Sequence, residues 1–336
     1  MKNLKNRRIA LIGGAGFVGH NLALELKRLG ADVSVIDGLQ VNNLLYFQQT
    51  QVDIAHREMY IQMIEERLEL LRKNKIPVFV EDARNYHKVS KVFGEIKPET
   101  VVLLAAVAHA NRSNKDPYTT FDHSTRTLEN ALDASRDGVK HFIYFSSSMV
   151  YGDFNSKAVT EESMCNPIGI YGALKFGAEK LVIAYNQVFG LPYTIIRPSA
   201  LYGERCVSRR VGQIFIENAL RGEPVDIHGD GSDSLDFTYI GDLVQGIVKV
   251  IDNEKSRNEV FNLTYGQARS INEMSKIIKK HFPKVKINYL PKDKLMPDRG
   301  TLSVEKAKKI LGYAPQYPLE KGFTKYIEWY KTFAKK

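Results

Sequence analysis

Residues 7–30 read RRIALIGGAGFVGHNLALELKRLG, and this stretch decides the fold. The apolar run before the glycines contains β-branched isoleucines and predicts a short buried strand, and the amphipathic run after them predicts a helix. Gly13 and Gly14 permit a tight turn between the two elements. Gly16 lets the backbone approach a pyrophosphate, and Gly19 lets the helix pack closely on the strand. Strand, glycine turn and helix together predict a nucleotide-binding site.

The next apolar run, at residues 31–38, reads ADVSVIDG and ends in a carboxylate, Asp37. A carboxylate at this strand end can accept hydrogen bonds from the adenosine ribose of a dinucleotide, and it would repel a 2′-phosphate. The sequence therefore favours NAD over NADP as cofactor. The alternative is that Asp37 is a simple turn residue before Gly38.

Apolar strands and helical runs continue to alternate along the chain. PVFVE, TVVLLAAVAH, HFIYFSS and LPYTII read as strands, and a helical run extends over residues 86–96. Regular alternation of this kind predicts an α/β fold with a parallel, doubly wound sheet. Asp82, at a strand end, is placed to reach the adenine, and Ala105 and Ala106 are small enough to admit the cofactor's ribose. An ordinary alanine-rich buried strand is the alternative for both alanines.

Residues 39–75 form an unusually long polar stretch between two predicted strands. Apolar residues in it recur near helical spacing, which predicts a helix docked by one face; they are Met59, Met63, Ile64, Leu68 and Leu71. A lid, a partner surface and a spacer all remain possible, and a spacer is favoured.

A second motif lies between residues 146 and 175, where SSSMVYG is followed by YGALK. Tyr171 and Lys175 are four residues apart in a predicted helix, so both side chains lie on one face, one turn apart. A neighbouring ammonium and a positively charged nicotinamide both favour the phenolate, which could take a proton from a sugar hydroxyl. Ser147 ends an apolar strand, which places its hydroxyl at the carboxyl edge of the sheet. Taken alone, this tyrosine and lysine spacing is also a common accident on surface helices.

Composition narrows the class of protein. The 336 residues are 43% hydrophobic and 26% charged, which is ordinary for a soluble globular protein. No apolar run is long enough to span a bilayer, and the polar start MKNLKNRR lacks the apolar core of a signal peptide, so we expect a cytoplasmic protein without membrane contact. The two cysteines, Cys165 and Cys206, have no metal-type spacing, and we expect free thiols and no metal.

The formal net charge is +10, which raises the question of nucleic-acid binding. The lysines are scattered along helices and gather near the end of the chain, as in KIIKKHFPKVK and KTFAKK, without interleaved aromatic residues. A solvated lysine-rich surface is the favoured interpretation, with no nucleic-acid partner. A basic cleft would help to attract an anionic substrate.

GGAGFVG, Asp37, Asp82, LAAVAHANRS, SSSMVYG, YGALK and RPSALYG occur in an order and spacing that covers nearly the whole chain. In this combination the chain resembles the extended short-chain dehydrogenase/reductase family that acts on nucleotide-diphosphate sugars. The resemblance implies a catalytic set of Ser147, Tyr171 and Lys175. It implies NAD contacts from Gly13, Gly16, Phe17, Val18, Gly19, Asp37, Asp82, Ala83, Ala105, Ala106, Tyr171 and Lys175, and substrate contacts from His109, Ser148 and Arg299.

The resemblance also implies a Rossmann-type sheet with a smaller α/β substrate-binding domain. The NAD-binding domain would comprise residues 1–197 with a returning segment at about 237–264, and the smaller domain residues 198–236 and 265–336. The substrate cleft would lie between them. Pairing of the helix before the catalytic strand with the Tyr171 helix implies a homodimer.

Departures from the family pattern narrow the reaction. Dehydratases of this family place an Asp-Glu pair, and decarboxylases a Glu, just after the catalytic hydroxyl residue, where this chain has Ser148 and Met149. Other departures are Leu235 for an Arg, Ala200 for an Asn, Glu204 for a Pro, and His123 or Ser124 for an Asn. Arg299 would then bind more of the substrate's diphosphate, with Arg209, Arg210 or Arg269 assisting.

These residues together predict 4-epimerisation of a nucleotide-diphosphate sugar through a transient 4-keto sugar, with NAD regenerated in each cycle. A nucleotide-sugar dehydrogenase or 4-keto-sugar reductase is the alternative enzyme. A cofactor-sensing binding protein is a third possibility, but such a protein has little need of Tyr171 and Lys175.

Overall fold

The computed structural model describes residues 4–49, 54–107, 110–154, 156–291 and 297–334. Within them, seven parallel strands form one sheet in the order β12-β7-β5-β4-β1-β2-β3. These strands are β1 (Arg8–Ile12), β2 (Asp32–Ile36), β3 (Val78–Phe79), β4 (Thr100–Leu103), β5 (His141–Phe145), β7 (Tyr193–Arg197) and β12 (Glu259–Asn262). The strand order reverses between β1 and β4, which is where doubly wound sheets open a ligand crevice. The predicted fold class is confirmed.

Helices cover both faces of the sheet because its central strands are apolar on both sides. In β5, Ile143 and Phe145 pack into the core on one face, and Phe142 and Tyr144 into the core on the other. The first face carries α1 (Phe17–Arg28), α3 (Arg57–Lys73) and α10 (Ile240–Asp252). The second carries α4 (Tyr86–Ile96), α7 (Thr127–Ser135) and α8 (Gly169–Phe189).

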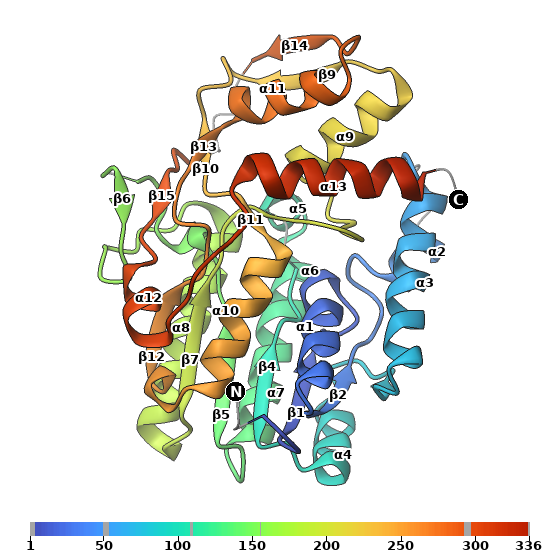
Figure 1. Ribbon diagram of the computed structural model, residues 1–336. Helices are drawn as coiled ribbons and strands as arrows, with labels where there is room; N and C mark the ends of the chain where they lie inside the picture. The colour runs from blue at the N-terminus through green and yellow to red at the C-terminus, as the bar shows by residue number, and fades with distance from the viewer. Residues whose placement is uncertain (1–3, 50–53, 108–109, 155, 292–296, 335–336) are drawn as a thin grey trace.

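A smaller group of elements lies over the carboxyl edge of the sheet (Figure 1). In it, β9 (Val225–His228) pairs with β14 (Ile287–Leu290), and α9 (Val211–Arg221) and α11 (Ile271–His281) pack beside α13 (Leu319–Phe333). Short strand pairs connect this group to the main sheet: β8 (Leu201–Tyr202) with β11 (Thr238–Tyr239), β10 (Ser234–Leu235) with β13 (Arg269–Ser270), and β6 (Ala158–Val159) with β15 (Thr301–Leu302). By contrast, α12 (Glu305–Leu311) packs against α10 and β12. The division into two domains stays a prediction.

Between β2 and β3, α2 (Leu44–Gln49) and α3 occupy the long polar stretch. As predicted, α3 is docked by one face: Met63, Ile64 and Leu71 are fully buried. Tyr60 on the same face donates a hydrogen bond from its hydroxyl to Glu217 Oε2 of α9 at 2.7 Å. This helix therefore ties the main sheet to the smaller group.

Between β4 and β5 the chain forms α5 (Ala110–Lys115), α6 (Pro117–Phe121), a π-helical turn (Asp122–Arg126) and α7. Turns of this kind inside helices often occur at functional sites. No helix among the described residues is long and apolar enough to cross a membrane.

Candidate active site

The glycine turn after β1 has the conformation that its sequence predicts. Gly13 adopts a positive φ of 83°, and an added Cβ there would lie 2.6 Å from the Ala105 backbone nitrogen. Only glycine fits this position without moving β4 away from β1. At Gly16 an added Cβ would meet only the Gly13 carbonyl oxygen, at 3.1 Å. The turn is thus closed on the sheet side and open beyond Gly16.

A cavity of about 750 Å³ opens at the carboxyl edge of the sheet, beside this turn. Every site residue predicted from the sequence lines it, apart from His109, which lies outside the described residues. The lining includes Gly13, Gly16, Phe17, Val18, Gly19, Asp37, Asp82, Ala83, Ala105, Ala106, Ser147, Ser148, Tyr171, Lys175 and Arg299. The fold therefore gathers residues from distant parts of the chain into one site, while their individual roles stay predictions.

Asp37 lies at the end of β2, next to the glycine turn. Its carboxylate accepts hydrogen bonds from the backbone N–H groups of Ala15 at 3.0 Å and Leu39 at 2.8 Å. Burial raises the pKa of Asp37, and these two hydrogen bonds act in the opposite direction. The open turn, this acceptor and the size of the cavity fit a dinucleotide.

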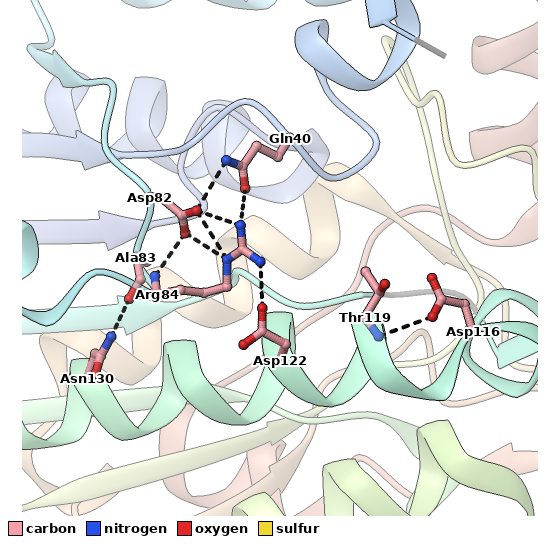
Figure 2. A network of polar contacts seen from close by, with 8 residues as sticks. All are labelled: Gln40, Asp82, Ala83, Arg84, Asp116, Thr119, Asp122 and Asn130. Carbon is pink, nitrogen blue, oxygen red and sulfur yellow. Dashed lines mark hydrogen bonds and ion pairs between the residues drawn. The ribbon is translucent and has the colours of Figure 1, made fainter. Parts of the chain in front are cut away.

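Figure 2 shows a network of side chains around Asp82, which lies close to the end of β2. The Arg84 guanidinium donates to both Asp82 oxygens, to Gln40 Oε1 at 3.2 Å and to Asp122 Oδ2 at 2.6 Å. Burial alone would raise the pKa of Asp82, but hydrogen bonds from Arg84 and Gln40 outweigh it and lower the pKa to about 2. Asp82 is therefore a carboxylate at neutral pH, and an acceptor only.

Ser147 and Tyr171 meet in the cavity. Ser147 begins a 3₁₀ turn (Ser148–Val150), and its Oγ accepts a hydrogen bond from the Met149 N–H at 3.2 Å. Burial raises the pKa of Tyr171, whereas the charge of Arg210 and a hydrogen bond with Ser147 lower it. The neighbouring Ser146 points elsewhere and donates to Glu179 Oε1 at 2.5 Å. Among the three consecutive serines, Ser147 is the one that lowers the pKa of the Tyr171 phenol.

Lys175 lies one turn along α8 from Tyr171 and is buried. Its Nζ donates to the Phe145 carbonyl oxygen at 2.7 Å and lies 5.0 Å from the centre of the Tyr144 ring. Burial lowers the pKa of Lys175 to about 8, and the charge of Glu179 acts against that shift. That Lys175 lowers the pKa of Tyr171 stays a prediction, since Arg210 is the cation that acts on the phenol here.

A buried ion pair supports this end of α8. Glu179 accepts two hydrogen bonds from Arg197 of β7, from Nε at 3.0 Å and from Nη2 at 2.7 Å. Arg197 also donates to the Tyr151 hydroxyl at 2.9 Å, and Tyr151 donates to Asn262 of β12 at 2.8 Å. The sequence analysis overlooked Glu179, although a glutamate four residues after Lys175 on one helix face was a usable signal.

Of the positions that depart from the family pattern, Glu204 has a local structural explanation. Glu204, in place of a Pro, accepts hydrogen bonds from the Tyr239 hydroxyl at 2.8 Å and from Lys325 Nζ at 2.9 Å, which fixes α13. Ala200 adopts a positive φ of 37°, a region in which asparagine is more comfortable than alanine. His123 lies in the π-helical turn and lines the cavity.

Arginines gather at the end of the cavity away from the glycine turn. Arg209, Arg210 and Arg299 line it, whereas Arg269 forms ion pairs with Glu273 at 2.9 Å and with Glu320 outside the lining. Burial and the nearby charge of Arg210 lower the pKa of Arg299 to about 10, against the opposing charge of Asp233. Two guanidinium groups so close together favour an anionic ligand.

Arg67 of α3 is a further residue that the sequence analysis did not single out. It is fully buried and lines the cavity, and its Nε donates to the Arg205 carbonyl oxygen at 3.0 Å. Its charge acts against the rise that burial causes in the pKa of Asp37. The long polar stretch thus contributes a residue to the site's surroundings, which its helical pattern could not reveal.

Comparison with known proteins places these features in context. A family model described as NAD dependent epimerase/dehydratase matches residues 9–264. The chain is 28% identical over 330 residues to a putative UDP-glucose 4-epimerase of Methanocaldococcus jannaschii, covering 96% of this chain and 98% of that protein. It is 28% identical over 333 residues to UDP-glucuronic acid decarboxylase 1 of Danio rerio, covering 96% and 72% of the two chains. Among solved structures, a UDP-glucuronic acid 4-epimerase from Bacillus cereus in complex with UDP-glucuronic acid and NAD matches with a TM-score of 0.86 at 27% identity, covering 96% of this chain and 99% of that one.

Proposed function

Because the chain belongs to the NAD-dependent epimerase/dehydratase family, we propose that it inverts carbon 4 of a nucleotide-diphosphate sugar. The observation that carries the proposal is the placement of Ser147, Tyr171 and Lys175 in one cavity with the glycine turn. Neither Ser148 nor Met149, which follow this serine, is an acid. In this family, elimination and decarboxylation need a carboxylate at these positions. Oxidation and reduction at the sugar carbon are therefore the favoured reactions.

The chemistry divides between cofactor and protein. NAD, when bound, supplies a reversible two-electron oxidant for the sugar carbon. Tyr171 takes the proton from the C4 hydroxyl and later returns one to the same oxygen. Ser147, beside the phenol, holds the same sugar hydroxyl and shares its proton. Lys175, anchored on the Phe145 carbonyl, keeps a positive charge one helical turn from Tyr171.

The substrate's diphosphate would bind at the arginine end of the cavity. Arg299 and Arg210 line this end, and the charge of Arg210 helps to lower the pKa of Arg299. A diphosphate carries negative charge and accepts the charge-assisted hydrogen bonds that guanidinium groups donate. We propose a UDP-sugar, because the relatives named above act on or bind UDP-sugars, and UDP-glucuronic acid is the first to test.

The test begins with the small molecules that the purified protein releases on denaturation. Stoichiometric NAD supports an epimerase that keeps its cofactor, and UDP-glucuronic acid, UDP-glucose and their N-acetylated counterparts are then incubated with it without added cofactor. Conversion of one of them to its C4 epimer, with no net change in NADH absorbance, is the expected result. Net NADH formation or consumption would instead support a nucleotide-sugar dehydrogenase or 4-keto-sugar reductase.

We propose a homodimer that pairs α7 and α8 with their copies in a second subunit. Large apolar side chains support this, since Tyr118, Phe121, Val188 and Phe189 near these helices are about half exposed or more. A cytoplasmic location and a role in carbohydrate biosynthesis belong to the same proposal. The two cysteines are free thiols, as is usual in a reducing compartment.

A further inference from the structure

Arg84 joins three separate segments at the adenosine end of the cavity. Gln40 follows β2, Asp82 and Arg84 follow β3, and Asp122 begins the π-helical turn. The guanidinium uses Nη1 for Asp122, Nη2 for Gln40 and Asp82, and Nε for Asp82 (Figure 2). Gln40 completes the network by donating from Nε2 to Asp82 Oδ2 at 3.2 Å. Each polar side chain of the network is therefore fixed by at least one other.

The network has an inner and an outer side. Gln40 and Asp82 line the dinucleotide cavity, whereas Arg84 is absent from its lining and faces a shallow surface hollow with Tyr86 and Arg126. Ala83, between Asp82 and Arg84, also lines the cavity, and Asn130 of α7 donates to its carbonyl oxygen at 3.0 Å. Arg84 thus acts on the cavity only through the residues that it holds.

We propose that Arg84 is a positioning residue that fixes Asp82 as the acceptor for the exocyclic amino group of the cofactor's adenine, and so makes the site select an aminopurine dinucleotide. The inference rests on NAD as cofactor, and it does not depend on C4 epimerisation. A fixed carboxylate accepts a hydrogen bond from an amino group. It repels the carbonyl oxygen that hypoxanthine carries at the same place, and a carboxylate free to rotate away would discriminate less.

The experiment compares NAD with nicotinamide hypoxanthine dinucleotide, in which that amino group is replaced by a carbonyl. Both are titrated calorimetrically into the full chain freed of bound nucleotide. The wild type should bind NAD on the order of tenfold more tightly, the effect of one hydrogen bond to a charged group. Arg84→Met should weaken the binding of NAD on the order of tenfold and the binding of the hypoxanthine analogue much less. The ratio of the two affinities should then be close to one.

Two further variants make the test specific. Arg126→Met removes a nearby arginine whose ion pair with Glu129, at 3.2 Å, is on the surface, and it should leave both affinities unchanged. Arg84→Lys keeps a positive charge beside Asp82 but lacks the planar fork of donors that bonds Gln40, Asp82 and Asp122, and its ratio should fall between wild type and Arg84→Met. If Arg84→Met does not fold, the affinity ratio of Arg84→Lys is compared with that of the wild type instead.

The ratio separates positioning from a merely structural role. Equal weakening of both dinucleotides in Arg84→Met would show that the substitution only loosens the cavity, and it would overturn the proposal. Unchanged NAD affinity, or a wild type that binds both dinucleotides equally, would overturn it as well. A wild type that binds neither would instead count against the proposed function, before any variant is compared.

Discussion

The buried pair of Glu179 and Arg197 gives the sharpest test of how this site is held together. The two side chains are 2% and 5% exposed, so Glu179→Gln leaves the guanidinium without its counter-charge inside the protein. Removing one partner of a buried ion pair costs about 3–5 kcal/mol of unfolding free energy. With an unfolding entropy of about 2.1 cal/mol/K per residue, or roughly 0.7 kcal/mol/K for the chain, the melting temperature should fall by ~4–7 °C.

Differential scanning calorimetry measures the change, and the chain supplies a matched control. Glu69 pairs with Arg72 at the same distance of 2.7 Å, but on the surface of α3. Because exposed pairs contribute about 0–1 kcal/mol, Glu69→Gln should move the melting temperature by no more than about 1 °C. Equal shifts in the two variants would refute the reasoning, since burial would then make no difference. In the double variant with Arg197→Met, part of the lost stability should return, because no buried charge is left unpaired.

Four further predictions concern the site and the subunit surface. Tyr171→Phe removes the proton-transfer group and should lower turnover by about 10²–10⁴-fold while the NAD content stays unchanged, as mass analysis of released nucleotide can check. The pKa of Lys175 is about 8 in the folded protein against an ordinary 10.5, so the unfolded chain binds this proton more tightly and the unfolding free energy should rise between those pH values. When Lys175→Met is unfolded with denaturant at a series of pH values, its unfolding free energy should not show that part of the rise. Gly13→Ala brings a Cβ to 2.6 Å from the Ala105 nitrogen at a positive φ, and it should cost about 1–3 kcal/mol in strain and weaken NAD binding, which calorimetry can measure; wild-type affinity would contradict the closed turn. Val188 is 71% exposed on α8, and Val188→Glu should disrupt the proposed dimer. If light scattering finds the same mass for the wild type and this variant, the result would count against the interface.

The sheet and the cofactor end of the site were predictable because their signals are local. The glycine turn, Asp37 and the four-residue spacing of Tyr171 and Lys175 each lie within one strand, turn or helix. Alternating strands and helices then predict a parallel sheet, whose geometry brings these residues to one edge. The predicted helix over 86–96 has those bounds in the structure.

Contacts between distant segments escaped the sequence analysis. Nothing local to Arg84 indicates that Gln40 and Asp122 will meet it, and nothing local to Glu179 indicates that Arg197 will. The polar stretch at 39–75 was favoured as a spacer because its pattern shows only that one face is buried. That Arg67 of α3 lines the cavity depends on how α3 docks, which periodicity does not encode.

The edge position of β12 has a consequence for how the protein is made. During synthesis β7 leaves the ribosome long before β12, which pairs with its outer edge, and before α10, which packs on α1. Until residue 262 has emerged, a nascent chain carries an unpaired strand edge and a bare apolar helix face, both of which favour aggregation. The nucleotide-binding half therefore completes its fold late in translation, when residues 198–236 are already outside the ribosome, and chaperones that cover apolar surface would act in that interval.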